Sequence, residues 1–521
     1  MFENVLGQSA TAQLTDDIHA GLLPPALLFS GPAASGKGTA ALELGRIISC
    51  EADAALRAPW GCSCPACARH RLLIHPDLLC LGSRPFSAEI AASAGAFLRE
   101  AATAREDTSS SHGAAREATR VLFIRAIRKL LARFNPALWE DEPKKGKVAL
   151  APLVNSMEEN LDEFDVLAAS NTAGSADNAS GLEKCVNGMV KSAFKLEAEG
   201  LSDSIPIDRI RCAAYWGRLA PAGKGKLLVI ENADRMQEEA RNSLLKLMEE
   251  PPPRLTLVLT TSRAGSLLPT MLSRLRPYRF FARDAAVEAD VIRRVFRDSR
   301  GGTISAYIDS FLPVSGEMLN ALAAFFAASV AYKAALLSKR QGRPIAQEAV
   351  LLGKFTAPRA EAAGLGRPQG HSAAVVLTVL EKADKFEIRP LFSRFLSCLL
   401  DNAAASQRVA NPPEADLLGS FGGAKTSGGG TDGGSSLPTQ AGRYGAAPRM
   451  GGSERPAQRG CSEGGVPPLE PSFSFLPSVS YNEVWKKCCA WGESAVSAYR
   501  LAPALVLEKL FADLSRALAE L

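Results

Sequence analysis

Residues Lys226–Ser262, KLLVIENADRMQEEARNSLLKLMEEPPPRLTLVLTTS, decide the fold class of this chain. Two short apolar runs, Leu227–Ile230 and Leu255–Thr260, have the pattern of buried strands. A helix is predicted between them, and Pro251–Pro253 must end it. One face of that helix carries Ala240, Leu244, Leu247 and Met248. Strands that alternate with helices predict an α/β fold with a parallel sheet and a ligand at the carboxyl ends of the strands.

A Gly-rich loop with the same kind of flanks lies near the amino terminus. The predicted strand Ala26–Ser30 leads into Gly31–Lys37, GPAASGK, and a predicted helix, Thr39–Ser49, follows. In such a loop, backbone N–H groups and the helix N-terminus hold phosphate, and the lysine reaches the terminal phosphates. The candidate nucleotide-binding residues are Gly31, Ser35, Gly36, Lys37, Gly38, Thr39 and Glu231.

The two acidic positions of a P-loop ATPase are altered. After the strand Leu227–Ile230, where such an enzyme carries Asp and then Glu, this chain has Glu231 and Asn232. The first acid would hold Mg²⁺, and the second would activate the attacking water. The loop also has Gly38 where a Ser or Thr would bind Mg²⁺, with Thr39 one place later. These changes predict binding without efficient hydrolysis, while a vestigial loop that binds nothing stays open.

Four of the eleven cysteines form a group just after the first core helix. Their spacing is Cys-x11-Cys-x-Cys-x2-Cys. Four thiolates can close a tetrahedral Zn²⁺ site, and a closed site of this kind is structural. The alternative is a set of ordinary reduced thiols. The predicted zinc ligands are Cys50, Cys62, Cys64 and Cys67.

Length and composition indicate a globular protein of about three domains. The chain has 521 residues, 46% of them hydrophobic, and a net charge of +5, which permits nucleic-acid contact without arguing for it. Apolar runs such as Ala321–Ala328 are shorter than the roughly 18–20 residues of a membrane span, and the first residues do not begin a signal peptide. We therefore expect a cytoplasmic location and no membrane partner.

A segment from about residue 84 to 203 interrupts the alternation of strands and helices and is interpreted as an insertion. A Ser-rich piece, Asp107–His112, and an acidic piece, Glu158–Asp165, lie around one predicted helix, Val121–Phe134. A solvated polar face is predicted for that helix, and a DNA-binding face is the alternative. The residues concerned are Arg125, Arg128, Lys129 and Arg133.

Beyond Arg283 the chain is predicted to be helical. The expected helices are Val287–Arg297, Glu317–Leu337 and Ala373–Ala405. Residues 406 to about 470 are rich in Gly, Ser and Pro and are predicted to form a flexible linker. The final segment has apolar residues at helical spacing and should dock onto the preceding helices.

Several motifs together resemble the bacterial DNA polymerase III clamp-loader subunits of the AAA+ class. Besides the loop and the four cysteines, they are Met1–Gln8, His75–Asp77, Ile207–Arg211, Asn242–Lys246 and Glu249–Pro251. The resemblance implies an AAA+ P-loop module with a small zinc module at 1–282, which contains the insertion at about 84–203. A helical lid at 283–328 and an all-α collar at 329–521, containing the linker, are implied to follow.

Within this family the chain is more similar to the delta-prime subunit than to the hydrolysing gamma/tau motor, which would carry Asp-Glu in place of Glu231 and Asn232. Leu319 stands where the motor has a phosphate-sensing arginine. Arg274, in Ser-Arg-Leu, matches an arginine that acts on the ATP of a neighbouring subunit, although the usual cysteine after it is Leu275. Arg274 is therefore the predicted catalytic residue in trans.

The resemblance also implies partners and cofactors. The expected partners are other clamp-loader subunits (gamma/tau and delta), the sliding clamp through the assembly, and primer-template DNA. ATP with Mg²⁺ is expected in a neighbouring subunit and is possible in this chain. The alternatives are a hydrolysing gamma/tau-type ATPase and, because Gly36–Thr39 reads Gly-Lys-Gly-Thr, a nucleotide monophosphate kinase.

Overall fold

The computed structural model describes residues 1–520 with nine internal gaps. The residues outside the description are 53–57, 107–109, 140–143, 171–175, 203, 367–371, 381–387, 411–479, 498–500 and 521. The described chain forms two compact units. Unit 1 comprises Met1–Leu322 and Ala374–Phe395, and unit 2 comprises Ala323–Ala373 and Leu396–Leu521.

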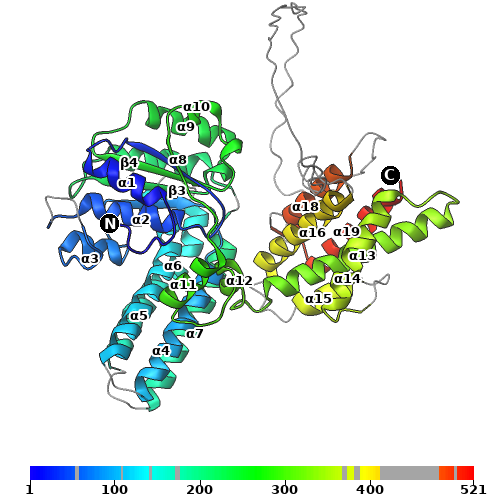
Figure 1. Ribbon diagram of the computed structural model, residues 1–521, viewed down its shortest axis with the longest axis horizontal. Coiled ribbons are helices and arrows are strands. Elements are labelled where there is room, and N and C mark those ends of the chain that lie inside the picture. Colours follow the sequence, from blue (N-terminus) through cyan, green and yellow to red (C-terminus); the bar gives the residue numbers. More distant parts are fainter. Residues whose placement is uncertain are drawn as a thin grey trace, which may run out of the picture. The chain divides into compact units, whose positions relative to one another are not determined.

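A five-stranded parallel sheet organises unit 1 (Figure 1). Its strand order is β2-β3-β4-β1-β5. The strands are β1 Ala26–Ser30, β2 Leu78–Gly82, β3 Lys226–Glu231, β4 Leu255–Thr261 and β5 Arg276–Arg279. The three strands predicted from the sequence are present, each to within one residue at either end. They are the inner strands, whose continuous apolar runs reflect burial on both faces.

The two outer strands were not predicted. β5 is short, contains Pro277 and has three exposed residues of four. An edge strand tolerates proline because one of its sides makes no ladder hydrogen bonds. β2 pairs with β3 alone and places Arg84 two residues beyond its carboxyl end.

Helices cover both faces of the sheet, and successive strand residues point to opposite faces. On one face, Leu27, Phe29 and Val229 pack with helices α1 and α2. On the other, Leu28 and Ile230 pack with α8 and α9 and share a core with the insertion. The helices that pack on the sheet, together with the shorter helices α3, α10, α11 and α12, have the following bounds: α1 Ala10–His19, α2 Lys37–Ser49, α3 Pro65–Arg71, α8 Ile207–Arg218, α9 Glu238–Glu249, α10 Pro269–Leu272, α11 Ala285–Val295 and α12 Ile304–Asp309.

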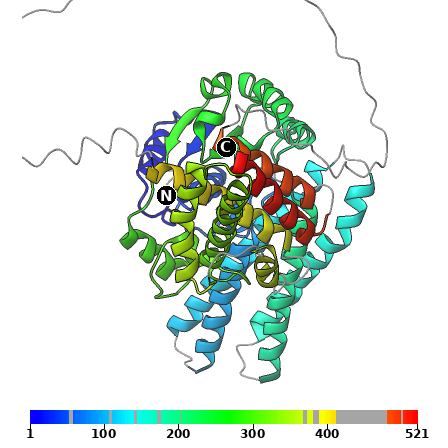
Figure 2. The same ribbon diagram turned by 90° about the vertical axis from the view of Figure 1, so that its right-hand side faces the viewer.

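The insertion is four long helices rather than the single predicted helix. In Figures 1 and 2 they extend away from the sheet as a layered array. Phe164 contacts Phe97 and Phe123 edge to face, with ring centroids 5.1 and 5.3 Å apart. Residues 110–112 of the predicted Ser-rich piece and the acidic piece Glu158–Asp165 are helical, whereas residues 107–109 lie outside the described residues. The four helices are α4 Ser87–Glu106, α5 Ser110–Leu131, α6 Lys144–Ser170 and α7 Ala176–Gly200.

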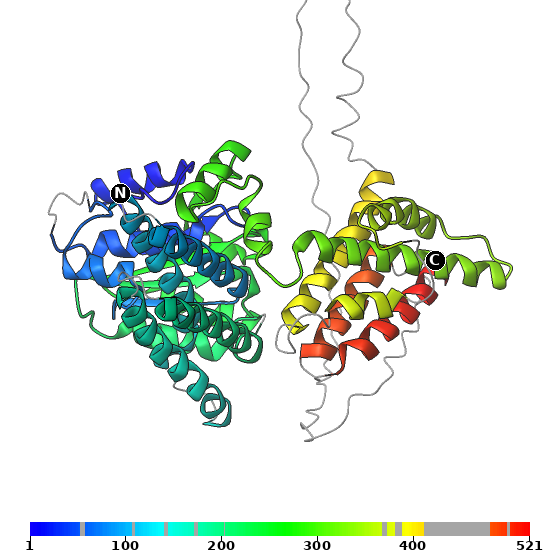
Figure 3. The ribbon, with the colours of Figure 1, turned by 90° about the horizontal axis from the view of Figure 1, so that it is seen from below.

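In the described part of unit 2, the regular secondary structure is helical (Figure 3). Trp485 and Leu510 are buried, and Phe326 contacts Phe511 with ring centroids 5.8 Å apart. The expected docking of the final helices onto earlier ones is therefore confirmed, whereas residues 411–470 of the predicted linker lie outside the described residues. The helices of this part of the chain are α13 Gly316–Arg340, α14 Gln347–Ala362, α15 Ser372–Leu380, α16 Ile388–Ala410, α18 Tyr481–Ser497 and α19 Pro503–Glu520. Some residues of α13, α15 and α16 belong to unit 1.

Helix α13 is longer and more apolar than the sequence pattern suggested. Among the described helices it alone has the length and composition to cross a membrane, and 67% of its most apolar window is buried. Core helices of globular proteins have the same properties. This one helix is therefore weak evidence for a membrane span.

Candidate functional site

The Gly-rich loop joins β1 to α2 at the carboxyl edge of the sheet. Gly31 has a φ of +152°, and a Cβ atom there would lie 2.1 Å from the carbonyl oxygen of Phe280, so only glycine fits. Lys37 is buried and donates hydrogen bonds to Gly31 O (2.6 Å) and Ser35 Oγ (3.3 Å). Burial lowers the pKa of Lys37 to about 8, although the carboxylates of Asp234 and Glu231 act to raise it.

A cavity of about 1130 Å³ adjoins this loop. Its lining includes the loop residues 33–39 and charged side chains from other elements of unit 1. Among them are Arg84, Lys129, Glu231 and Arg283. The predicted nucleotide-binding residues other than Gly31 therefore line one cavity, at the edge of the sheet where parallel α/β folds bind ligands.

Glu231 lies at the carboxyl end of β3, where two arginines contact one of its carboxylate oxygens. Its Oε2 accepts hydrogen bonds from Arg84 Nε at 2.8 Å and from Arg133 Nη2. Its Oε1 lies 2.8 Å from the position that a Cβ atom of residue 38 would occupy. Burial opposes ionisation of Glu231, but the neighbouring arginines Arg84 and Arg133 hold its pKa below the ordinary range.

These residues do not fit a Mg²⁺ ion. Magnesium requires near-octahedral oxygen coordination at 2.0–2.1 Å. Gly38 offers no hydroxyl, and the Glu231 carboxylate is neutralised by two guanidinium groups. A metal ion bound there would have to displace arginines that the fold holds in place. No metal-dependent step follows from this site.

Asn232, at the position of the missing base, has a structural role. It adopts a left-handed conformation with φ 52° and ψ 55°, which asparagine tolerates better than most residues. Its Nδ2 donates to Ser83 O at 2.8 Å, and its backbone N–H donates to Thr260 Oγ1 at 3.3 Å. The side chain therefore links the carboxyl ends of β3 and β2, and an amide cannot accept the proton of an attacking water.

The prediction of a solvated basic face on Val121–Phe134 is wrong. Arg128 Nη1 donates to Leu72 O at 2.9 Å, and Arg125 Nη1 donates to Arg71 O, so both satisfy carbonyl groups at the C-terminus of α3. Lys129 pairs with Glu89, and Arg133, 5% exposed, pairs with Glu231. The basic residues thus hold the insertion to the P-loop core, which removes the basis for a DNA-binding face.

We expect Glu231→Ala to lower the free energy of unfolding by about 3–5 kcal/mol, because it leaves the buried guanidinium of Arg133 without its counterion and removes one of the two carboxylates that pair with Arg84. The stabilisation should be present above the ordinary carboxyl pKa and lost as the pH falls through the lowered pKa of Glu231. Urea denaturation at neutral and acidic pH measures both effects. The control is Glu249→Ala, which removes an exposed pair and should cost at most about 1 kcal/mol. Equal losses in the two variants would contradict the buried-pair account.

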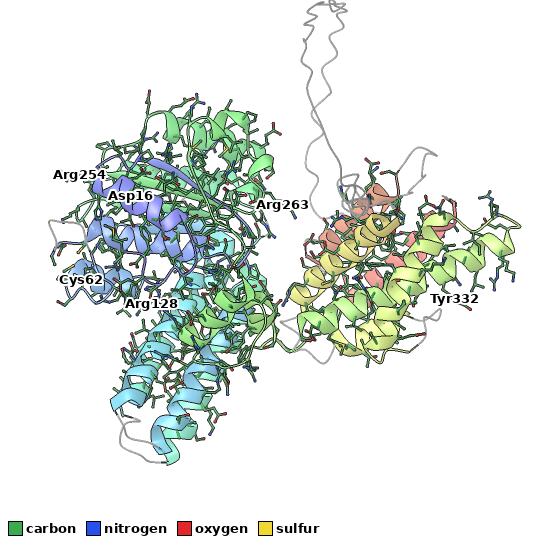
Figure 4. All side chains as sticks on the ribbon, in the orientation of Figure 1. Asp16, Cys62, Arg128, Arg254, Arg263 and Tyr332 are labelled. Atoms are coloured by element: carbon green, nitrogen blue, oxygen red, sulfur yellow. The ribbon has the colours of Figure 1, made fainter. Side chains whose placement is uncertain are left out.

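The four predicted zinc ligands converge. Their sulfur atoms all lie within 4.8 Å of one another, and the Sγ atom of Cys50 lies 3.7 Å from that of Cys62 and 4.0 Å from that of Cys64. A tetrahedral site with Zn–S bonds of about 2.3 Å needs sulfur atoms about 3.8 Å apart. The donor set therefore fits Zn²⁺, which would cross-link the end of α2 to the start of α3. Figure 4 marks Cys62 in this module.

Arg46 contacts the cysteine cluster through Cys67. It is 1% exposed, and its Nη1 lies 3.4 Å from Cys67 Sγ and 3.0 Å from Pro59 O. Its Nε donates to Glu43 Oε1 at 3.0 Å. A hydrogen bond to the sulfur of a metal ligand fixes its orientation and favours the thiolate. Because Arg46 lies on α2, the zinc module is attached directly to the helix that follows the phosphate loop.

Arg274 lies far from its own phosphate loop. It precedes β5, which begins opposite Leu27 of β1, whereas the loop follows the end of β1. Because a five-residue strand such as β1 spans about 16 Å, Arg274 and the loop lie toward opposite ends of the strand. The Arg274 guanidinium is 36% exposed and contacts Glu249 Oε1 at 2.9 Å and Thr270 O at 2.8 Å. It is accessible to another molecule and does not line the cavity of its own loop.

Sequence reasoning missed Arg84, Glu89 and the role of Arg133. Arg84 could have been found once Leu78–Gly82 was recognised as a strand, since residues just beyond the carboxyl ends of parallel strands border the ligand site. Nothing in the local pattern distinguishes Arg133 from a surface arginine. Leu319 is buried, so no charged group replaces the sensing arginine at that position.

Comparisons with known proteins agree with the motifs. The family described as "DNA polymerase III, delta subunit" matches residues 137–284. The DNA polymerase III subunit delta' of Pseudomonas aeruginosa (strain PAO1) is 31% identical over 103 residues, which cover 20% of this chain and 31% of that protein. The chain thus spans about a third of the length of this curated relative.

A solved structure, that of a DNA polymerase III gamma subunit-related protein from Thermotoga maritima, is 19% identical in sequence. The matched region covers 42% of this chain and 78% of the Thermotoga maritima chain. The TM-score between the two structures is 0.18. The family match and the delta' relative, together with the motifs, show that this chain is similar to bacterial DNA polymerase III clamp-loader subunits over these parts of its length.

Proposed function

We propose that this chain is a delta-prime-like subunit of the clamp loader that does not hydrolyse ATP and contributes Arg274 to the ATP site of a neighbouring subunit. One observation carries the proposal: the position beside Glu231 where an ATPase holds Mg²⁺ has Arg84 and Arg133 instead. Without the metal and a general base, P-loop chemistry lacks its two main contributions. Hydrolysis would then take place in the neighbouring subunit.

The exposure of Arg274 supports its action in trans. An arginine supplied by a neighbour stabilises the charge that develops on the transferred phosphoryl group. Arg274 meets the structural requirement, since its guanidinium is on the surface at the amino end of the sheet. In the loaded assembly it would complete a gamma/tau site and couple ATP binding to opening of the sliding clamp.

The remaining parts follow from this role. We propose that residues 283–328 form the lid, that 329–521 form the collar that joins gamma/tau and delta, and that Zn²⁺ is structural. The partners would be those subunits, the clamp and primer-template DNA, in the cytoplasm. The hypothesis of a hydrolysing gamma/tau-type subunit would require a residue other than Asn232 to act as the base. The kinase hypothesis would require a binding site for a nucleoside monophosphate.

We expect the isolated chain to show no ATP turnover with Mg²⁺ above that of its Lys37→Ala variant, because both lack a metal site and a base. Release of inorganic phosphate from purified protein measures this, and a hydrolysing clamp-loader subunit serves as the positive control. Turnover that disappears in Lys37→Ala would instead identify a gamma/tau-type motor. Phosphoryl transfer to a nucleoside monophosphate would identify the kinase.

A further inference from the structure

The insertion supplies two cations at the place where a P-loop site holds its metal. Arg84 follows β2, and Arg133 follows the last turn of α5. Both guanidinium groups contact the same oxygen of Glu231, Oε2. The other oxygen, Oε1, faces Gly38, where the metal-binding hydroxyl is missing. Gly38, which lacks the metal-binding hydroxyl, and the two arginines therefore lie next to the same carboxylate, that of Glu231.

Packing holds these arginines rigidly. The guanidinium carbon atoms of Arg84 and Arg133 lie 4.0 and 5.1 Å from the ring centroid of Phe86. Trp139 Nε1 donates to Arg133 O at 3.0 Å. Arg84 also donates from Nη1 to Glu89 Oε2 at 2.9 Å. A planar guanidinium fixed by stacking and by ion pairs stays charged and oriented, as a phosphate-binding group must.

The charges in this cluster do not cancel. Three cations, Arg84, Lys129 and Arg133, are paired with two carboxylates, Glu89 and Glu231. One positive charge remains in the cluster, and over the whole cavity lining eight cationic side chains, Lys37 among them, face seven carboxylates. Arg133 is 5% exposed, and within the described part of the chain its Nε and Nη1 make no hydrogen bond. A buried guanidinium with free donors beside an uncompensated charge favours an anion.

Of the two arginines that contact Glu231, Arg84 is the one that lines the cavity. Its side chain is 22% exposed, and it lines the cavity together with the phosphate loop, whereas Arg133 lies behind Glu231. Arg84 would meet a ligand from its packed position, while Arg133 keeps Glu231 neutralised. A nucleotide phosphate chain would then meet Lys37, the loop N–H groups and Arg84, which together supply the positive charge that a divalent metal otherwise brings.

We propose that this chain binds a nucleoside triphosphate in its metal-free form, with Arg84 in place of Mg²⁺ and Arg133 holding Glu231. The inference rests on the proposed nucleotide site and is independent of the role of Arg274. It assigns the insertion a function, which is to convert a metal-dependent site into a metal-independent one. Metal-free binding also prevents turnover, since no metal neutralises the charge that develops during phosphoryl transfer.

The test is calorimetric titration of ATP into the full-length protein, in EDTA and in excess Mg²⁺. The expected result is binding in EDTA that is at least as tight as in Mg²⁺, because Mg²⁺ removes charge from the phosphates that Arg84 would contact. Binding that requires Mg²⁺, or no binding in EDTA, would overturn the proposal. This comparison uses the unmodified protein and does not depend on the folding of a variant.

Two variants locate the effect. Arg84→Ala should weaken ATP binding in EDTA about 10- to 100-fold, the usual value for a lost hydrogen bond to a charged group. Arg211→Ala, which removes a 60% exposed arginine on α8 outside the cavity, should leave binding unchanged. Arg84→Lys keeps the charge and should recover part of the loss. Equal binding by Arg84→Ala and Arg211→Ala would overturn the assignment of Arg84, while the turnover of the assembled complex tests Arg274 separately.

Discussion

Replacement of Arg274 by alanine is expected to reduce the ATP turnover of a clamp-loader assembly reconstituted with this chain by about 10³-fold or more at the neighbouring site. The reason is geometric. Arg274 is exposed at the amino end of β5, away from its own loop, so its guanidinium is available to a second subunit. The measurement is steady-state phosphate release by the complex with DNA and clamp present, combined with size-exclusion chromatography to show that the complex stays assembled.

The matched control is Arg276→Ala. Arg276 lies two residues away at the start of the same strand, its side chain is 52% exposed, and its nearest carboxylate, Asp17, is 4.0 Å distant. Its removal changes the surface charge equally but should leave turnover near the wild-type rate. If both variants hydrolyse ATP as fast as the wild type while assembled, Arg274 has no role in trans. If Arg274→Ala prevents assembly, the residue is an interface contact and the catalytic role is likewise rejected.

The second large effect concerns the cysteine cluster. Cys67→Ser should reduce bound zinc from about one ion per chain to almost none, because a structural site needs all four ligands and Cys67 is fully buried. Structural zinc contributes strongly to folding, so we expect the melting temperature to fall by at least about 5 °C. Elemental analysis of the purified protein and thermal denaturation with and without chelator measure the two effects.

Cys185→Ser is the control for this substitution. Cys185 is half-buried on α7 and belongs to the insertion, outside the cluster of four sulfur atoms. This variant should retain zinc and melt within a few degrees of the wild type. A Cys67→Ser protein that keeps its zinc, or a wild type that carries none after purification without chelator, would show that the cluster consists of ordinary thiols.

Several features of this chain could be predicted because they depend on neighbouring residues. The inner strands β1, β3 and β4 are apolar runs buried on both sides, so composition alone indicates them. The buried face of α9 follows from its spacing of apolar residues. The edge strand β5 could not be predicted, since four residues that include proline and two arginines become a strand only by pairing with β1.

The insertion shows why the remaining features could not be predicted. Periodicity identifies which side of α5 is apolar, but a polar side looks the same whether water or a buried carboxylate covers it. The solvated interpretation failed for this reason. The partners that decide the matter are far away in the sequence: Glu231 lies 147 residues from Arg84 and 98 from Arg133.

By itself, the sequence determined the parallel α/β core, the phosphate loop with its missing hydroxyl and base, and the cysteine spacing of a closed metal site. Each is a local pattern whose chemistry follows from residue type and spacing. Only the tertiary structure decided what stands in place of the metal, because Arg84, Arg133 and Glu231 come from three distant segments that meet when β2, α5 and β3 pack together. Charges are placed by the fold that buries them, and their function depends on that placement.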